Sequence, residues 1–249
     1  MKAVILCAGL GSRTGFNYPK CLYKFDDGST LLSKNIEAIK KYGFKNSDII
    51  LVTGFKSSLI KKETNYLYEY IQNHHYASTN MVYSFNEVIK KYKSQSYYIF
   101  YADIIFDSKN ISFLKKSKNQ ISTLIDTDWL KKSGNKKNYL NDLEELKIQK
   151  NRIIQLGKKV KKIKNIDGRF VGITKYSKKI INKIINENIM HDVLKKNKKI
   201  DLTNFLMHLI NENYDIFAIK KKVNWHEFDE YYDFKKFIKI YKKFFFKKY

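Results

Sequence analysis

The chain has 249 residues, of which 43% are hydrophobic and 15% aromatic, so it can bury a sizeable core and is not a disordered protein. Lysine and arginine total 49 against 24 acidic residues, which gives a net charge of +25. Only three basic residues are arginines (Arg13, Arg152 and Arg169), whereas proteins that read nucleic acids rely heavily on the planar guanidinium group. We therefore attribute the charge to a lysine-rich composition and do not expect nucleic acid as a substrate.

Cysteine content and hydropathy argue against a disulfide-rich, a membrane-spanning or a secreted protein. The two cysteines, Cys7 and Cys21, are too few for a disulfide framework in a chain of this length. No stretch approaches the roughly 20 apolar residues that cross a membrane. The apolar run at the N-terminus passes directly into Gly-Leu-Gly-Ser-Arg, which is unlike a signal peptide. We expect a cytoplasmic protein without a transmembrane segment.

The first half alternates short apolar runs with amphipathic segments. We predict strands at 3–7, 48–53 and 97–101, and helices at 31–42, 57–71 and 80–91. This β-α-β-α-β order indicates a parallel sheet with right-handed crossovers. Such a sheet binds its ligands at the carboxyl ends of its strands.

The second half is less regular. We predict strands at 122–125, 170–176 and 216–219, a hairpin of 146–148 with 153–156, a polar loop at 131–137, and helices at 178–186, at 202–211 and from Tyr231 onward. The fold class is α/β, with a three-layer α/β/α arrangement, a mainly parallel mixed sheet and a small inserted β-hairpin. We expect one domain over residues 1–249, with a nucleotide-binding half at about 1–110 and an acceptor-binding half at about 111–249.

A glycine-rich loop follows the first predicted strand. Gly9 and Gly11 let the main chain approach a ligand closely, so that consecutive amides can form an anion-binding nest. Arg13 and Lys20 add positive charge, and Pro19, the single proline, stiffens the backbone before Lys20. Amides for the α- and β-phosphates together with cations for a leaving pyrophosphate are what a nucleoside triphosphate requires. An ordinary tight turn between strand and helix is the alternative explanation for the glycines alone.

The run LCAGLGSRTG and the following YPK (residues 6–20) resemble the signature of the nucleotidyltransferases that activate sugar phosphates and small phosphorylated alcohols. Further motifs match in the same order over about residues 1–235, namely Val52–Phe55, Asn80–Ser84, Tyr101–Asp103, Glu145–Ile148, Gly168–Gly172 and Trp225–Asp229. The short length and the missing Pro-Leu-Thr after Arg13 make the chain more similar to the small cytidylyltransferases of the phosphocholine and 2-aminoethylphosphonate type.

The resemblance implies a site for CTP and Mg²⁺. The nucleotide-binding residues would be Leu6, Ala8, Gly9, Gly11, Ser12, Asn80, Ser84 and Ala102. Arg13 and Lys20 would serve the β- and γ-phosphates, and Lys147 the α-phosphate or the acceptor phosphate. Asp103 ends a buried apolar strand, where an unpaired carboxylate is costly, and Asp229 follows a second strand; together they would hold Mg²⁺. An oxygen of the acceptor phosphate would attack the α-phosphorus in line, and pyrophosphate would leave.

The acceptor is less well defined by the resemblance. Trp129 and Glu227 lie where the phosphocholine branch carries a cage for the quaternary amine, and Asp192 keeps an acid of that cage without its aromatic neighbours. Arg169 stands where glutamate is usual and could pair with an acceptor carboxylate. Phosphocholine, an aminoethylphosphonate and an amino-acid phosphate such as the glutamine phosphate of capsule pathways therefore remain open as acceptors.

Two alternatives remain. One is a sugar-1-phosphate nucleotidyltransferase that uses UTP or dTTP. The other is a basic module that binds nucleic acid or an anionic membrane through the lysine runs at 158–164 and 242–248 and the aromatic C-terminal helix. The plainer explanation of the helix is that its aromatic stripe packs on the domain itself or on a second subunit of a homodimer.

Overall fold

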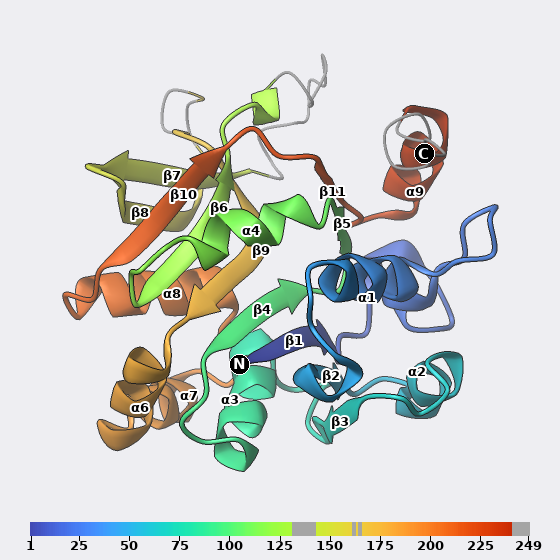
Figure 1. The fold of residues 1–249 in the computed structure, drawn as a ribbon, viewed down its shortest axis with the longest axis horizontal. Helices are drawn as coiled ribbons and strands as arrows, with labels where there is room; N and C mark the ends of the chain where they lie inside the picture. Colours follow the sequence, from blue (N-terminus) through green and yellow to red (C-terminus); the bar gives the residue numbers. More distant parts are fainter. Residues whose placement is uncertain (131–142, 161–162, 164–165, 241–249) are drawn as a thin grey trace.

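The computed structural model describes residues 1–130, 143–160, 163 and 166–240. Within them the centre is a nine-stranded mixed sheet with the order β3-β2-β1-β4-β9-β6-β10-β8-β7 (Figure 1). Its strands are β1 (Lys2–Cys7), β2 (Ile49–Thr53), β3 (Glu69–Gln72), β4 (Tyr97–Tyr101), β6 (Ile121–Asp126), β7 (Glu144–Gln149), β8 (Arg152–Lys159), β9 (Arg169–Tyr176) and β10 (Ile216–Lys221).

The pairing confirms the mainly parallel sheet of the first half. β1 pairs in parallel with β2 and β4, and β2 pairs in parallel with β3. β9 runs antiparallel between β4 and β6 and so joins the two halves of the chain. The predicted hairpin is β7–β8, and it extends the central sheet beyond β10 instead of standing apart as an insertion.

Helices cover both faces of this sheet (Figure 1). Alternate residues of β1 point to opposite faces, and each face has its own buried cluster. One cluster is shared with α3 (Met81–Lys91), α6 (Lys178–Asn186), α7 (Ile189–Lys196) and α8 (Leu202–Asn211). The other is shared with α1 (Leu31–Lys41), α2 (Ser57–Glu63) and α4 (Lys109–Lys115). The three-layer α/β/α prediction is thereby confirmed.

One predicted helix is wrong in its second part. The segment 57–71 was expected to be helical throughout, but α2 ends at Glu63 and β3 begins at Glu69. Asn65 and Tyr66 have positive φ angles of 50° and 56°, which break the helix. Residues 69–72 then pair with β2, and Ile71 is buried on the sheet. The pairing of β3 with β2 therefore decides the conformation of this segment, against the helix that its sequence predicts.

A third, smaller core lies beside the sheet. It contains Phe25, Leu31, Ile105, Phe228, Phe234 and Phe237. Phe234 and Phe237 belong to α9 (Tyr231–Ile240) and are fully buried. The described part of the aromatic stripe therefore packs on its own domain. Residues 241–249 of the predicted C-terminal helix, which include the lysine run at 242–248, lie outside the described residues, as do the loop predicted at 131–137 and part of the lysine run at 158–164.

No helix in the described part of the chain is long and apolar enough to cross a membrane.

His226 makes this small core sensitive to pH. Its ring packs edge-on against Phe228 at 4.8 Å and stacks on Phe237 at 5.4 Å, and burial lowers its pKa from 6.5 to about 4. A base whose pKa is depressed in the folded state is protonated first in the unfolded state, so stability is lost as the pH falls below about 6.5. We expect the free energy of unfolding to fall by about 2 kcal/mol between pH 7 and pH 5 through this group.

The measurement is urea unfolding of the wild type and of His226→Phe at both pH values. The phenylalanine variant should lose less stability on acidification than the wild type does. Equal losses in the two proteins would show that other groups carry the pH dependence.

Candidate functional site

The glycine-rich loop runs from the carboxyl end of β1 into a short 3₁₀ turn at Ser12–Thr14. Gly11 has φ +62°, and a Cβ atom added there would lie 3.0 Å from the Cβ of Lys20. Gly9 has no such constraint, since nothing lies within 4 Å of a Cβ at that position. The loop therefore needs Gly11 both for its backbone conformation and to make room for Lys20.

This close approach leads to a prediction with a matched control. Gly11→Ala should lower kcat/KM for the nucleotidyl transfer that the sequence resemblance implies by more than tenfold, because the added methyl group strains the backbone and displaces Lys20. Gly28→Ala introduces the same kind of strain at φ +78° with nothing within 4 Å, so it should cost stability without that loss of activity. Steady-state kinetics and thermal unfolding of both variants separate the two effects. Equal activity of the two variants would contradict the role of the contact.

Lys20 lies between two carboxylates. Its Nζ is 2.7 Å from Oδ2 of Asp103 and 3.9 Å from Oδ1 of Asp229. Asp229 also accepts a hydrogen bond of 2.8 Å from the Arg13 guanidinium. The Lys20 side chain is 14% exposed whereas that of Arg13 is 66% exposed. Lys20 is thus held in place, and Arg13 reaches the cluster from solvent.

A two-stranded sheet brings the two aspartates together. Asp103 lies between β4 and β5 (Ile104–Phe106), and Asp229 follows β11 (Trp225–Glu227). β5 and β11 pair antiparallel, and the amide of Phe228 donates 2.8 Å to the carbonyl of Asp103. Burial, together with the negative charge of Asp103, raises the pKa of the Asp229 carboxyl. A cation between the two carboxylates relieves this repulsion.

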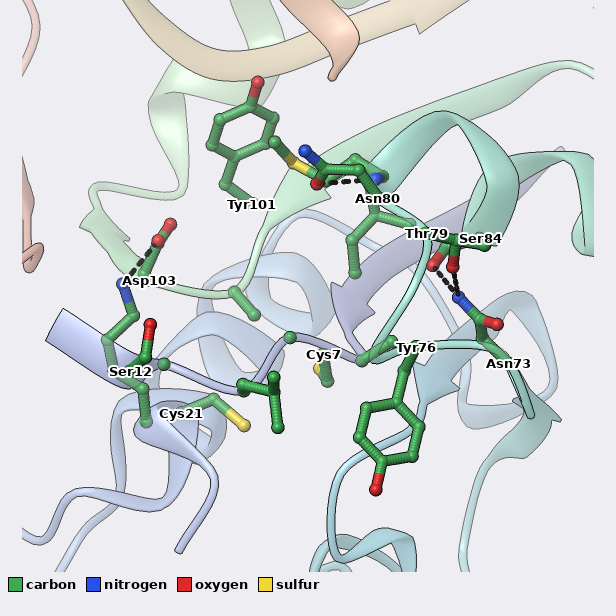
Figure 2. Close-up of a pocket in the computed structure, with 18 of the residues that line it drawn as sticks. Cys7, Ser12, Cys21, Asn73, Tyr76, Thr79, Asn80, Ser84, Tyr101 and Asp103 are labelled. Carbon is green, nitrogen blue, oxygen red and sulfur yellow. Dashed lines mark hydrogen bonds and ion pairs between the residues drawn. The ribbon is translucent and has the colours of Figure 1, made fainter. Parts of the chain in front are cut away.

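These groups line one cavity of about 420 Å³ at the carboxyl ends of β1 and β4 (Figure 2). Of the predicted site residues, its lining includes Leu6, Ala8, Gly9, Gly11, Ser12, Arg13, Lys20, Asn80, Ser84, Ala102, Asp103 and Asp229. The segment after β3 closes the side of the cavity, with Tyr76 and Thr79 in its wall. Gly54 permits this, because a Cβ there would lie 2.6 Å from both the Ala8 carbonyl and the Cβ of Tyr76.

Two predicted acceptor residues form a pair outside that lining. The Arg169 guanidinium donates 2.7 Å to Oε2 of Glu227 and lies 5.2 Å from the ring of Trp225. Burial raises the pKa of Glu227 to about 7, against the lowering effect of Arg169. Arg169 was expected to pair with an acceptor carboxylate. In the structure the carboxylate of Glu227 already occupies one side of the Arg169 guanidinium.

The structure does not bring the other three predicted residues to the cavity wall. Lys147 lies on β7, 3.4 Å from Asp167. Trp129 is 6% exposed, so its ring is buried. Asp192 is in the first turn of α7, 65% exposed and paired with His191. The segment that follows the last turn of α7 reaches Asn80, whose main-chain amide donates to the carbonyl of Lys198. The last turn of α7, and not the first turn with Asp192, is therefore the end near the cavity.

Comparisons with known proteins show the family of this chain. Residues 3–120 match the MobA-like NTP transferase domain. The CTP:phosphoglutamine cytidylyltransferase of Campylobacter jejuni is 31% identical over 248 residues, which cover 92% of this chain and 96% of that protein. The chain belongs to this nucleotidyltransferase family.

Solved structures share the fold of this chain. The inositol-1-phosphate CTP transferase of T. maritima superposes with a TM-score of 0.71 at 18% identity, over 98% of this chain and 96% of that one. The CTP:phosphocholine cytidylyltransferase of Streptococcus pneumoniae superposes with a TM-score of 0.69 at 20% identity, over 96% and 98%. The 31% identical relative and the family match show that the chain is a nucleotidyltransferase, the class of enzyme that the sequence motifs resemble.

Nucleotidyltransferases of this family generally use a divalent metal ion, and the two aspartates fit one. Oδ2 of Asp103 pairs with Lys20, whereas Oδ1 is buried and has no hydrogen-bond partner in the described structure, so Oδ1 is the atom that a second cation would stabilise. Among the described residues, no group of three or more His, Cys, Asp or Glu side chains could hold a metal. Two carboxylates with the remaining ligands from water and phosphate are the usual arrangement for Mg²⁺.

Several cavity residues of the nucleotidyltransferase were missed by sequence reasoning. They are Cys7, Leu10, Cys21, Asn73, Tyr76, Ala77, Thr79, Met81, Tyr101 and Lys199. Cys7, Leu10 and Cys21 could have been inferred as neighbours of the motif residues. Lys199 could not be inferred, because it belongs to the segment after α7, far from the motifs in sequence. Asn80 holds that segment at the cavity by donating hydrogen bonds to the carbonyls of Lys198 and Lys199.

Proposed function

We propose that this enzyme transfers the cytidylyl group of CTP to a small phosphorylated acceptor of the amino-acid class and releases pyrophosphate, with Mg²⁺ as its metal ion. The observation that carries the proposal is the cavity in which the glycine-rich loop, Lys20, Asp103 and Asp229 meet. It holds the cations that a triphosphate needs and the carboxylates that a divalent ion needs. The 31% identity to a phosphoglutamine cytidylyltransferase supports the choice of CTP and of the acceptor class.

The reaction needs no nucleophilic side chain. An oxygen of the acceptor phosphate, anionic at neutral pH, forms a bond to the α-phosphorus as the bond from that phosphorus to the bridging oxygen of the β-phosphate breaks. The electron pair of that bond leaves with pyrophosphate. Main-chain amides of residues 9–13 and the ammonium of Lys20 would bind the negative charge on the leaving group.

When bound, the metal ion would neutralise charge on the phosphate oxygens, and Asp103 and Asp229 would hold it. Lys20 lies between the two carboxylates, so its ammonium offsets part of their mutual repulsion. With nucleotide bound, the same ammonium can turn to a phosphate oxygen. Arg13, which is mostly exposed, can follow the γ-phosphate from the rim.

The acceptor class is supported by the pair of Arg169 and Glu227. An amino acid carries both a carboxylate and an ammonium group, and this pair offers a partner for each. A cage for a quaternary amine needs an accessible aromatic face, whereas Trp129 is buried. Both observations favour an amino-acid phosphate over phosphocholine. The homodimer and the cytoplasmic location stay predictions.

The test is pyrophosphate release with CTP, UTP, dTTP and ATP, each combined with glutamine phosphate, phosphocholine, 2-aminoethylphosphonate and a sugar 1-phosphate. We expect turnover with CTP and glutamine phosphate, dependent on Mg²⁺ and lost on its removal by a chelator. Turnover only with a sugar 1-phosphate and UTP or dTTP would replace the proposal by its nearest alternative. Salt-sensitive binding to duplex or vesicles, without turnover of any pair, would favour a binding module.

A further inference from the structure

The turn between β11 and α9 carries Asp229, and hydrogen bonds from three consecutive main-chain amides fix it. The amide of Phe228 donates 2.8 Å to the carbonyl of Asp103. The amides of Asp229 and Glu230 donate 2.9 Å and 2.8 Å to Oδ2 of Asp233. Two of these hydrogen bonds therefore end on a single carboxylate oxygen.

Asp233 is the third residue of α9 and is not among the residues that the sequence motifs single out. The next residue, Phe234, is fully buried, as is Phe237 one turn further along the helix. Both belong to the small third core, which places α9 beside the two-stranded sheet of β5 and β11 (Figure 1). Because the helix is anchored in this way, the carboxylate of Asp233 is a fixed acceptor for the turn.

The side chain of Asp229 is held from the other direction, by cations of the cavity. Its Oδ1 lies 2.8 Å from Arg13 and 3.9 Å from Lys20. In the proposed reaction both cations turn toward phosphate oxygens, so they no longer hold this carboxylate when nucleotide is bound. The main-chain hydrogen bonds to Asp233 do not involve the cavity, and they remain.

We propose that Asp233 is a positioning residue that holds the main chain of Asp229, so that the Asp229 carboxylate stays where it can bind a divalent ion together with Asp103. The proposal rests on the proposed function, in which these two carboxylates hold the ion. A hydrogen-bonded support outside the ligands contributes to metal affinity, because a ligand that is already in place loses less freedom on binding. The metal site thus depends on the docking of α9 as well as on the strands.

The central test compares Asp233→Ala with Asp233→Asn. Both substitutions remove the negative charge, but the asparagine oxygen can still accept from the two amides, so the difference between the variants measures the hydrogen bonds alone. The readout is thermal unfolding at a constant CTP concentration with increasing MgCl₂. For a fixed rise in melting temperature, the MgCl₂ concentration required scales with the dissociation constant of the ion. We expect Asp233→Ala to require about tenfold more MgCl₂ than the wild type and Asp233→Asn to stay close to the wild type.

A matched control tests whether the effect comes from helix capping in general. Asp48 is likewise the third residue of a short helix, and its Oδ2 accepts 2.9 Å from the amide of Lys45. It precedes β2 and so lies at the amino ends of the strands, opposite the cavity. Asp48→Ala should lower the melting temperature but leave the MgCl₂ requirement unchanged.

Asp233→Ser keeps the test decisive if Asp233→Ala does not fold. At the same position of α1, Ser33 accepts 2.8 Å from the amide of Thr30, the residue before the helix. A serine at position 233 should therefore keep the hydrogen bond from Glu230, which caps α9, but it is too short to hold the amide of Asp229 as well. It should require as much MgCl₂ as Asp233→Ala.

The proposal is overturned if Asp233→Ala, or Asp233→Ser in its place, needs no more MgCl₂ than the wild type. It is also overturned if Asp233→Asn loses as much affinity as Asp233→Ala, because charge and not hydrogen bonding would then be the cause. If MgCl₂ adds nothing to the melting temperature of the wild type with CTP, the proposed function itself fails.

Discussion

Replacing Lys20 with alanine is expected to lower kcat for pyrophosphate release about a thousandfold or more, the size of effect seen when a fixed charge is removed from a developing anion. The physical reason is that the lysine ammonium would have to turn only from the cavity wall to neutralise charge on the leaving pyrophosphate. It lies 2.7 Å from Asp103, and the Lys20 side chain is only 14% exposed, so its position is restricted. Pyrophosphate release with saturating CTP and acceptor measures the effect.

The control for this variant is Lys24→Ala, four residues along the chain. Lys24 is exposed, so its loss should leave turnover unchanged. Lys20→Ala should remain folded, because it deletes a charge at the wall of a cavity and not an apolar contact of the core. Circular dichroism and thermal unfolding verify this point. Turnover of Lys20→Ala within a few-fold of the wild type would contradict the role of Lys20.

The first half of the fold was predictable because its signals are local. A buried parallel strand appears as a continuous apolar run, and 3–7 and 97–101 lie within one residue of β1 and β4. The amphipathic helices 178–186 and 202–211 coincide with α6 and α8. At 69–72, by contrast, the neighbouring strand decides the conformation, and no local pattern records that neighbour.

Part of the cavity lining was predictable from the sequence, but the contacts within it were not. The glycine-rich loop and its cations are adjacent in sequence, so their types indicate phosphate binding. The contact of Lys20 with Asp103 spans 83 residues, and that of Arg13 with Asp229 spans 216. Both depend on the pairing of β5 with β11, strands of three residues each. Strands so short carry no periodicity that a sequence can show.

Asn73 illustrates a different limit. A single asparagine between a strand and a helix is typical of a turn, and nothing in the sequence distinguishes one that binds solvent from one that is buried against hydroxyl groups. Only the packing of 73–80 against Thr53 and α3 buries the amide and gives it two hydroxyl partners. The position of Asp192 could not be predicted for the same reason, because the direction of α7 decides which of its ends approaches the cavity.

Asp103→Asn should abolish turnover almost as completely as the loss of Lys20, for a different reason. The amide keeps the size of the carboxylate and an oxygen for Lys20, but it removes the negative charge from the position where Oδ1 is buried without a partner. A divalent ion loses one of its two protein carboxylates, so we expect kcat/KM to fall about a thousandfold.

A matched control separates this effect from general loss of charge. Asp215 forms an exposed ion pair with Arg152, at 2.9 Å and 49% exposure, so Asp215→Asn should be silent in activity and nearly so in stability. The decisive readout is thermal unfolding with CTP, with and without MgCl₂. In the wild type Mg²⁺ should raise the melting temperature beyond the effect of CTP alone, because a ligand that binds only the folded state stabilises it. Asp103→Asn should lose that increment while Asp215→Asn keeps it. An increment that survives in Asp103→Asn would place the divalent ion elsewhere and leave Lys20 as the true partner of this carboxylate.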